Sequence, residues 1–375
     1  MLFCCVSKRL KASRCLPLAI PSCLVALITV GFASLAYGQA DQQAPNSPVT
    51  RRQMSAEELA AVEAHQQRLA QQAGATNPAA AAQPKSPQLP PGFPLPADEQ
   101  LYVEQVLDYW QQTSDKVRQY KCDFLRYEYD TTNVNLRDPE TNQLYAFQQA
   151  AGQIRFSAPD KARFETTKVF GFEKPPEQKG ANATYAEQAG HSIWGRKIHE
   201  CWVCTGKSTF DFDFEGKARY ETKIPPQLQG NIAESPLPFL FGAKKDDVMN
   251  RYWVRYIPKY ETDAQGKQTL IQNEIWLDIY PKRINDAQVY SKVELILSAA
   301  DFMPLAIHMY SPNYNPAKNN YSSRYFLFQN RKVNGAFTAV RDWAKIFIEP
   351  TVPATWRKVD RQQAAQSAKV PGQQR

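Results

Sequence analysis

Histidine is scarce in this chain, with four among 375 residues. A zinc site needs several Cys, His or carboxylate ligands that converge, usually as closely spaced pairs. His199 and Cys201 could share one face of a strand, but no second pair with ligand spacing lies near them in the sequence. The sequence therefore predicts no bound metal and no other cofactor.

Sequence signatures of common enzyme classes are also missing. The chain has no G-x-S-x-G elbow, no phosphate-binding loop and no dinucleotide-binding fingerprint. Asp211 and Asp213 could act as a carboxylate pair, because residues two apart on a strand lie about 7 Å apart on one face. Acids that alternate with phenylalanines are, however, typical of a solvated sheet face. We therefore expect no catalytic residues and no enzymatic activity.

The middle of the chain has no excess of either charge, although the whole chain carries a formal charge of +8. Residues 1–40 contain four basic side chains and no acidic one, and residues 351–375 contain five basic and one acidic. Each of these two segments therefore carries +4, and together they account for the whole excess. A nucleic-acid-binding surface that spans the chain is excluded.

Long hydrophobic runs are confined to the N-terminus. Basic residues between Lys8 and Arg14 precede the apolar run Leu16–Ala36, and small residues follow at Gly38 and Ala40. This order is that of a secretory signal peptide, and no stop-transfer pattern follows it. We expect residues 1–40 to be removed and the mature protein to be extracytoplasmic, either periplasmic or secreted, without a transmembrane anchor.

Three of the seven cysteines, Cys122, Cys201 and Cys204, lie outside the predicted signal peptide. An odd number in an oxidising compartment allows one disulfide and one free thiol, or three free thiols. Cys201 and Cys204 are three apart on a predicted strand, so their side chains point to opposite faces and cannot readily join. The remaining pairings are Cys122 with Cys201 or Cys204, with Cys122–Cys204 as the candidate disulfide, but buried free thiols are the favoured interpretation.

Composition divides the rest of the chain into three parts. Residues 41–97 are rich in Gln, Ala and Pro, which predicts a disordered tether that ends in an extended proline run at Pro90–Pro96. Residues 98–350 are predicted to form one folded domain. The polar and basic residues 351–375 are predicted to form a disordered tail.

Hydrophobic periodicity within residues 98–350 predicts one helix followed by a long series of strands. Apolar residues recur at helical spacing from Leu101 to Val117, whereas Lys197–Phe214 has the period of two and the central Gly206 of a β-hairpin. About ten strands joined by short turns predict an antiparallel meander. Further strands are predicted at 120–130, 152–157, 161–169, 218–223, 252–257, 271–280, 289–298, 303–310, 323–330 and 338–347, with a loop at 170–192.

A sheet of this size with one apolar face must be covered. The chain offers two covers, the N-terminal helix and residues 229–250. Pro236 and Pro238 exclude a sheet strand in the first part of the second cover. Its hydrophobic residues Phe239 and Phe241 predict a short helix or loop that lies against an apolar surface.

The order of these pieces resembles that of the LolA/LolB-like carriers of lipoproteins. The resemblance rests on the leading helix, on GQIRFSAPDKARFE (Gly152–Glu165), on CTGKSTFDFD (Cys204–Asp213) and on SPLPFLFG (Ser235–Gly242). The pieces YKCDF, PLPFLFGAK and WLDIYPK are more narrowly similar to an uncharacterised family of secreted planctomycete proteins. The resemblance implies a mainly β (α+β) fold, a strongly curved antiparallel half-barrel whose concave face is closed by helices around an apolar cavity. The resemblance also implies a short helical lid, which residues Pro236–Phe241 would form here. The carriers have an arginine where this chain has Ala158.

These observations predict a secreted, non-enzymatic protein that binds a hydrophobic ligand, a lipid or a lipoprotein acyl group, in the half-barrel. A protein-interaction module of the cell envelope with a solid core is the alternative, and a hydrolase is a third. The sequence does not indicate an oligomeric state. The predicted lining residues are Trp202, Phe210, Phe212, Phe214, Ile275, Leu277, Val293 and Leu295, and the predicted lid residues are Pro236, Pro238, Phe239 and Phe241.

Overall fold

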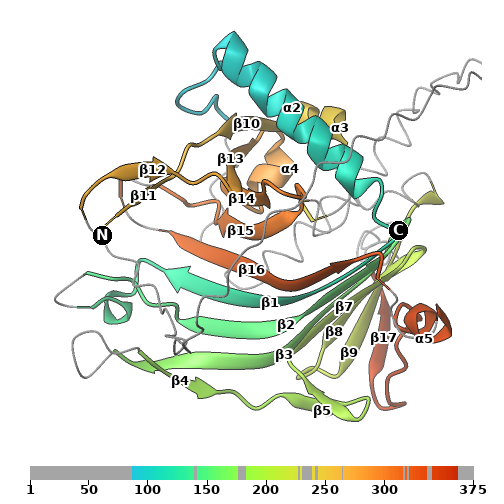
Figure 1. Ribbon diagram of the computed structural model, residues 1–375. Coiled ribbons are helices and arrows are strands. Elements are labelled where there is room, and N and C mark those ends of the chain that lie inside the picture. The colour runs from blue at the N-terminus through green and yellow to red at the C-terminus, as the bar shows by residue number, and fades with distance from the viewer. Residues whose placement is uncertain are drawn as a thin grey trace, which may run out of the picture. The chain divides into compact units, whose positions relative to one another are not determined.

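The computed structural model describes a single polypeptide in several stretches (Figure 1). The described residues are 87–138, 142–175, 183–226, 229, 239–240, 244–263, 265–315, 317–318, 321–335 and 340–361. The predicted signal peptide, most of the predicted tether and the lid residues Pro236, Pro238 and Phe241 lie outside them.

One large curved sheet organises these residues (Figure 1). In spatial order its strands are β10 (Tyr252–Tyr256), β13 (Glu274–Pro281), β14 (Lys292–Ser298), β15 (Pro304–Tyr310), β16 (Ser322–Val333), β1 (Gln119–Asp130), β2 (Gln148–Ser157), β3 (Lys161–Lys174), β7 (Glu200–Thr205), β8 (Ser208–Asp213), β9 (Ala218–Lys223) and β17 (Arg357–Asp360), with β4 (Thr184–Glu187) on β3. All these pairings are antiparallel except that of β17 with β9. Strands β10 and β17 are the two edges of the sheet and do not pair with each other. The sheet is therefore open and curved, as predicted, and is not a closed barrel.

The strand order differs from that of a simple meander. Strand β1 lies in the middle of the sheet, between β2 and the late strand β16. One meander, β1-β2-β3-β7-β8-β9, therefore continues sideways into a second, β10-β13-β14-β15-β16. The connection from β9 to β10 leads from one end of the sheet towards the other, and α3 (Lys245–Arg251) is its described last part.

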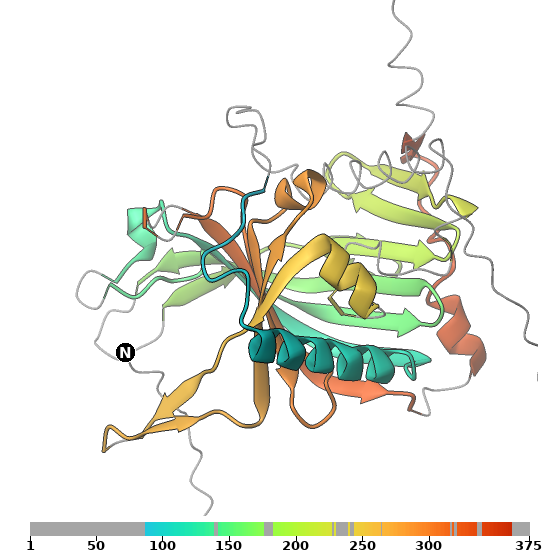
Figure 2. The same cartoon turned by 90° about the horizontal axis from the view of Figure 1, so that it is seen from above.

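Helices α2 (Ala97–Ser114) and α3 lie over one face of the sheet (Figure 2). Val103, Val106, Leu107 and Trp110 recur at spacings of three and four on α2 and are buried in the main core. α3 is tied to α2 by Lys245, whose Nζ lies 2.9 Å from Asp108 Oδ2 and whose amide donates to Gln111 Oε1. No helix in the described stretches combines the length and the apolarity needed to cross a bilayer.

The face beneath these helices is here called the helix-covered face. It carries Tyr120, Cys122 and Phe124 of β1, which alternate with residues of the other face. The other face, called the opposite face, is covered in part by the hairpin of β5 (His191–Ile193) and β6 (Arg196–Ile198). A second hairpin, β11 (Tyr260–Thr262) with β12 (Gln268–Leu270), forms a two-stranded sheet separate from the large one.

Residues 170–192 form more than the predicted loop. β3 continues to Lys174, and Phe172 contacts Tyr145 and Tyr185, with ring centroids 5.9 and 5.8 Å apart. These partners lie 13 or more residues away in the chain, so local periodicity does not reveal them. Pro175 then follows the end of the strand, as expected for a residue that cannot donate to the ladder.

Residues 338–347 contain a helix, α5 (Val340–Lys345), and not the predicted strand. Trp343 and Phe347 are four residues apart and are both buried, with ring centroids 5.7 Å apart. This spacing is helical, and the prediction of a strand gave too much weight to β-branched and aromatic residues.

The inner ends of the two segments predicted to be disordered are ordered. Arg255 donates to the carbonyl of Pro91, 3.0 Å away, so the chain is held in place before Asp98. At the other end, β17 lies inside the predicted tail and extends the sheet. Four-residue edge strands carry little sequence signal of their own, because their pairing partner is distant.

Two smaller elements complete the described structure, the single-turn helices η1 (Val134–Leu136) and α4 (Ile284–Ala287). α4 is anchored by an ion pair of 2.7 Å between Asp286 and Arg251 of α3.

Candidate functional site

Four of the predicted lining residues lie together on the helix-covered face. Leu277 of β13 lies opposite Leu295 of β14, and Ile275 and Val293 lie in the neighbouring rows. All four are buried in the main core. The row of Leu277 and Leu295 continues through Ile307 and Phe326 to Arg126 of β1.

Trp202 reaches the same face from the other meander. Its row runs through Phe164 and Ile154 to Cys122. The indole is 8 % exposed, and its Nε1 has no hydrogen-bond partner among the described residues.

Phe210, Phe212 and Phe214 lie on the opposite face, away from the other five predicted lining residues. Trp202 pairs directly with Asp211, so the phenylalanines on either side of Asp211 point the other way. They pack with Trp194 and Trp356, and the Trp194 and Phe212 rings are 5.2 Å apart. The period of two separated the two faces correctly but gave no information on which face the helices cover.

The described lid residue, Phe239, is 3 % exposed and contacts Tyr252 and Tyr290, with ring centroids 5.4 and 6.1 Å apart. Its neighbour Leu240 is fully buried. These two residues contact the strands of the second meander on the helix-covered face.

Three phenylalanines form a continuous surface on the helix-covered face, here called the aromatic floor: Phe124, Phe164 and Phe326. The Phe124 ring stacks on Phe164 at 4.7 Å and lies 5.9 Å from Phe326. Phe164 and Phe326 are only partly buried. Sequence reasoning did not predict this surface, because strand register, which is not visible in the sequence, brings the three rings together.

An ionic cluster of Arg126, Glu128, Glu200 and Arg324 borders the aromatic floor. Arg126 donates to both carboxylate oxygens of Glu200 at 2.5 and 2.9 Å, and its Nε lies 2.9 Å from Glu128. Arg324 lies 3.5 Å from Glu128. Burial raises the pKa of Glu200, but the hydrogen bonds and charge of Arg126, together with a hydrogen bond from Thr166 and the charge of Arg324, hold this pKa below its ordinary value.

Two further buried polar atoms, Trp110 Nε1 and Ser114 Oγ of α2, have no partner among the described residues. The two residues are 1 % and 7 % exposed and, four apart, lie on the same side of the helix. A buried donor without an acceptor costs about 1–3 kcal/mol, so such atoms are uncommon in native proteins.

All three cysteines of the folded part are free and buried. Cys122 and Cys204 lie on the same face but three strands apart, which is about 14 Å at about 4.8 Å per step. A disulfide needs Cα atoms within about 7 Å, so the candidate pair cannot join without rearranging the sheet. No group of Cys, His, Asp or Glu in the described stretches is arranged to hold a metal ion.

A hydrogen-bonded chain of Glu294, His308 and Ser323 on the opposite face has the connectivity of a hydrolase triad. His308 Nε2 lies 3.0 Å from Ser323 Oγ, and Nδ1 lies 3.4 Å from Glu294. Ser323, however, is 4 % exposed and is paired on both sides within the sheet, so neighbouring amides are engaged in the ladder and do not form an oxyanion hole. The geometry favours a structural polar network, which sequence reasoning missed because it crosses three strands.

No family model matches the chain. A search of curated proteins also found no match. Among solved structures, the chain is similar to an uncharacterised conserved protein from Thermus thermophilus, with 9 % identity and a TM-score of 0.33 over 69 % of this chain and 99 % of the other. It is also similar to a LolA superfamily protein from Nitrosomonas europaea, with 10 % identity and a TM-score of 0.25 over 65 % and 97 % of the two chains.

A third similar structure is a putative outer membrane lipoprotein-sorting protein domain from Vibrio parahaemolyticus, with 12 % identity and a TM-score of 0.24. It covers 65 % of this chain and 98 % of its own. Likenesses at these TM-scores assign this chain neither a family nor a function.

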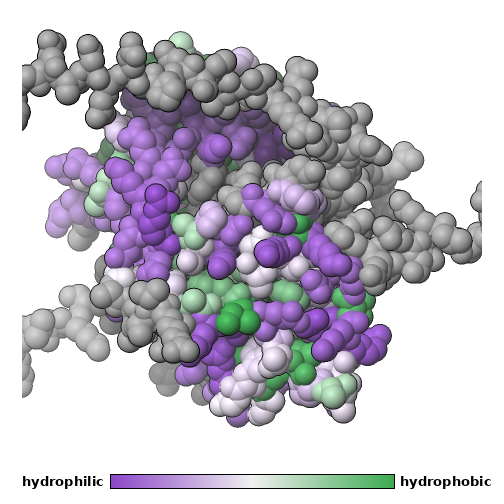
Figure 3. All heavy atoms as spheres, turned by 90° about the vertical axis from the view of Figure 1, so that its right-hand side faces the viewer, coloured by the Kyte–Doolittle hydropathy of each residue, from purple (hydrophilic) through white to green (hydrophobic). Residues whose placement is uncertain are grey.

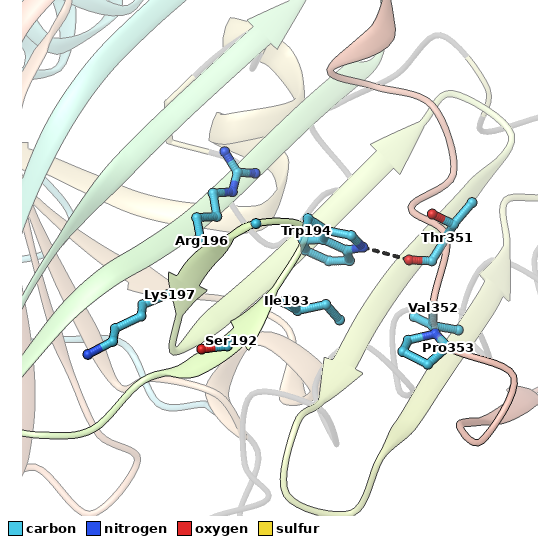
Figure 4. A pocket seen from close by; sticks show the side chains of 9 residues that line it. Ser192, Ile193, Trp194, Arg196, Lys197, Thr351, Val352 and Pro353 are labelled. Carbon is cyan, nitrogen blue, oxygen red and sulfur yellow. Dashed lines mark hydrogen bonds between the residues drawn. The ribbon is translucent and has the colours of Figure 1, made fainter.

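A pocket of about 680 Å³ lies on the opposite face, between the β5–β6 hairpin and residues 351–353 (Figure 4). Trp194 points towards Thr351 and donates to its carbonyl at 2.5 Å, whereas Lys197 points away. The Arg163 guanidinium lies 5.5 Å from the Trp194 ring. These contacts hold the segment that leads into β17. The side of the molecule that carries the C-terminal elements is mainly hydrophilic, with small separate hydrophobic patches (Figure 3).

Proposed function

We propose that this protein binds a lipid acyl chain on the helix-covered face, against the aromatic floor and beneath α2 and α3, and acts outside the cytoplasm as a non-enzymatic carrier or sensor. The observation that carries this proposal is a set of three buried donors that have no partner among the described residues, Trp110 Nε1, Ser114 Oγ and Trp202 Nε1, in a mainly apolar core. An ester or carboxyl oxygen would supply the acceptor that they lack. Apolar surroundings with few polar groups are typical of ligand sites.

The partly buried state of Phe164 and Phe326 supports the same location. Aromatic side chains contribute large apolar areas, and an acyl chain that covered these two rings would remove more of that area from water. Phe210, Phe212 and Phe214 are not included, because their own cover is the β5–β6 hairpin.

Native mass spectrometry of the full chain, exported to the periplasm of an expression host and purified without detergent, tests this proposal. We expect an additional mass that organic extraction removes and that is identified as a lipid. Phe164→Asp should abolish it, because a buried carboxylate among the rings is unfavourable. Phe212→Asp on the opposite face is the matched control, and circular dichroism checks that both variants are folded.

A polypeptide mass that stays unchanged after incubation with mixed phospholipid vesicles would contradict lipid binding. That result would favour the alternative, a protein-interaction module whose helix-covered face is a solid core. The unpaired donors would then destabilise the folded protein without taking part in ligand binding.

A further inference from the structure

We propose that Arg126 binds the anionic group of the ligand, a carboxylate or a phosphate, and that Glu200 is a counter-ion which the ligand displaces. This inference rests on the proposed function, because it assigns the chemical class of the ligand at the same site.

The position of Arg126 places its charge at the end of the aromatic floor. Arg126 is directly opposite Phe326 on the neighbouring strand and follows Phe124 on the same face. It is 6 % exposed. A buried guanidinium must keep an anionic partner, since an unpaired charge in the interior is strongly unfavourable.

Its present partner, Glu200, comes from a distant strand. Between β1 and β7 lie β2 and β3, and beneath the ion pair the rows carry the small residues Ala150, Gly152 and Thr166. The Arg126–Glu200 pair therefore spans the helix-covered face and is not a contact between neighbouring strands.

Exposure differs strongly between the two partners. The side chain of Arg126 is 7 % exposed, whereas that of Glu200 is 46 % exposed. A carboxylate on the solvent side can leave the pair and be hydrated, while Arg126 stays buried and keeps its contact with Glu128. A ligand carboxylate or phosphate offers the same two oxygens to the guanidinium fork that Glu200 now occupies.

A second arginine–carboxylate cluster in the same sheet has the reverse arrangement. Glu165 on the opposite face is 2 % exposed and is surrounded by Arg155, Arg163 and Arg196. There the carboxylate is enclosed, and Arg196, with a side chain 43 % exposed, lies outermost. The buried Arg163 of this cluster is bound to Glu165 and to the carbonyl of Ile346, and the enclosed Glu165 cannot give way to an incoming anion.

Binding of single-chain ligands to the full chain, measured by isothermal titration calorimetry after delipidation, tests the inference. The probes are sodium oleate, oleyl alcohol, which is neutral, and oleoyl lysophosphatidate, which carries a phosphate. We expect oleate or the lysophosphatidate to bind at least about tenfold more tightly than oleyl alcohol, the value for one charged hydrogen-bonded pair. The tighter of the two identifies the anion, and inorganic phosphate alone should not bind measurably.

Two variants separate the roles of the ion pair. Glu200→Gln should raise the affinity for the anionic probes several-fold, because it removes a competing carboxylate, and should leave that for oleyl alcohol unchanged. Arg126→Gln should reduce the affinity for the anionic probes to that for oleyl alcohol. Arg155→Gln, on the opposite face, is the matched control and should change neither affinity.

Equal affinities for oleate, the lysophosphatidate and oleyl alcohol, with no effect of Glu200→Gln, would overturn the inference and leave the proposed function in place. Failure of all three lipids to bind would instead contradict the proposed function itself. If Arg126→Gln does not fold, the comparison of charged and neutral probes in the wild type and in Glu200→Gln decides the question.

Discussion

Gly152 shows how one residue without a side chain makes room for the aromatic floor. It lies directly opposite Phe124 on the adjacent strand. A Cβ atom at this position would lie 2.5 Å from the Phe124 ring and would also clash with the carbonyl oxygen of Glu165. Because one obstacle is backbone, a small shift of a side chain cannot relieve the overlap.

Gly152→Ala should therefore destabilise the protein by about 1–3 kcal/mol, the cost of forcing extra atoms into a packed site. Urea denaturation followed by circular dichroism measures the change in the free energy of unfolding. Gly171→Ala on β3 is the control, because its Cβ would meet only the flexible end of Gln188. Equal stabilities of the two variants would show that Gly152 is not a close-packed position.

Burial protects the three cysteines, Cys122 and Cys204 on the helix-covered face and Cys201 on the opposite face. Burial raises the pKa of the Cys122 and Cys201 thiols to about 12 and that of Cys204 to about 11. The thiolate is the reactive form, so these groups should be inert in the folded protein.

We expect no reaction with a thiol-specific reagent in the native mature chain at pH 8, and reaction of three thiols per chain after denaturation. The raised pKa values also predict a pH effect. The contribution of the protonated thiols to stability is complete below the unfolded-state pKa of about 8.5 and is lost as the pH rises towards 11–12. Cys201→Ala should weaken the decline in stability between pH 8 and 10. Rapid native labelling at pH 8 would contradict the burial of these groups.

Among the elements, β17 is the one whose contribution could be judged only in the folded structure. It pairs in parallel with β9, and Lys223 and Asp360 form an ion pair of 3.0 Å across this edge. Trp356, just before the strand, packs its ring against Phe214 at 5.8 Å. The edge of the sheet and the cover of the opposite face therefore depend on residues beyond Pro350.

A chain that ends at Pro350 should have a lower melting temperature than one that ends at Arg361, because it exposes Phe214 and leaves β9 as the edge strand. Differential scanning calorimetry of the two truncated chains provides the measurement. The chain that ends at Arg361 is the control and should melt like the full-length protein. Identical melting of both truncated chains would mean that β17 does not contribute to stability.

At the scale of the whole molecule, the pairing of β1 with β16 joins the two meanders. Tyr120 lies opposite Val333, and the ladder runs to Asp130 opposite Ser322. Residues from both meanders share one core cluster, in which Phe124 and Trp202 lie with Leu277 and Leu295. Neither meander can bury its apolar face alone.

We therefore expect a single cooperative unfolding transition for the folded part, with equal calorimetric and van't Hoff enthalpies. The additional test is Phe328→Ala, which removes a side chain directly opposite Phe124 at the joint between the meanders. This variant should shift the whole transition to lower temperature without splitting it. Two separate transitions in the wild type would show that the meanders are independent units.

The sequence by itself determined the local features of this protein. The period of two in residues such as Ile275, Leu277 and Ile279 identified strands and their alternate faces, and the spacing on α2 identified the amphipathic helix, because both patterns follow from backbone geometry. The tertiary structure decided which faces came together. The separation of Phe210, Phe212 and Phe214 from Trp202, the aromatic floor and the Arg126–Glu200 pair all depend on strand order and register, which arise from contacts between residues far apart in the chain.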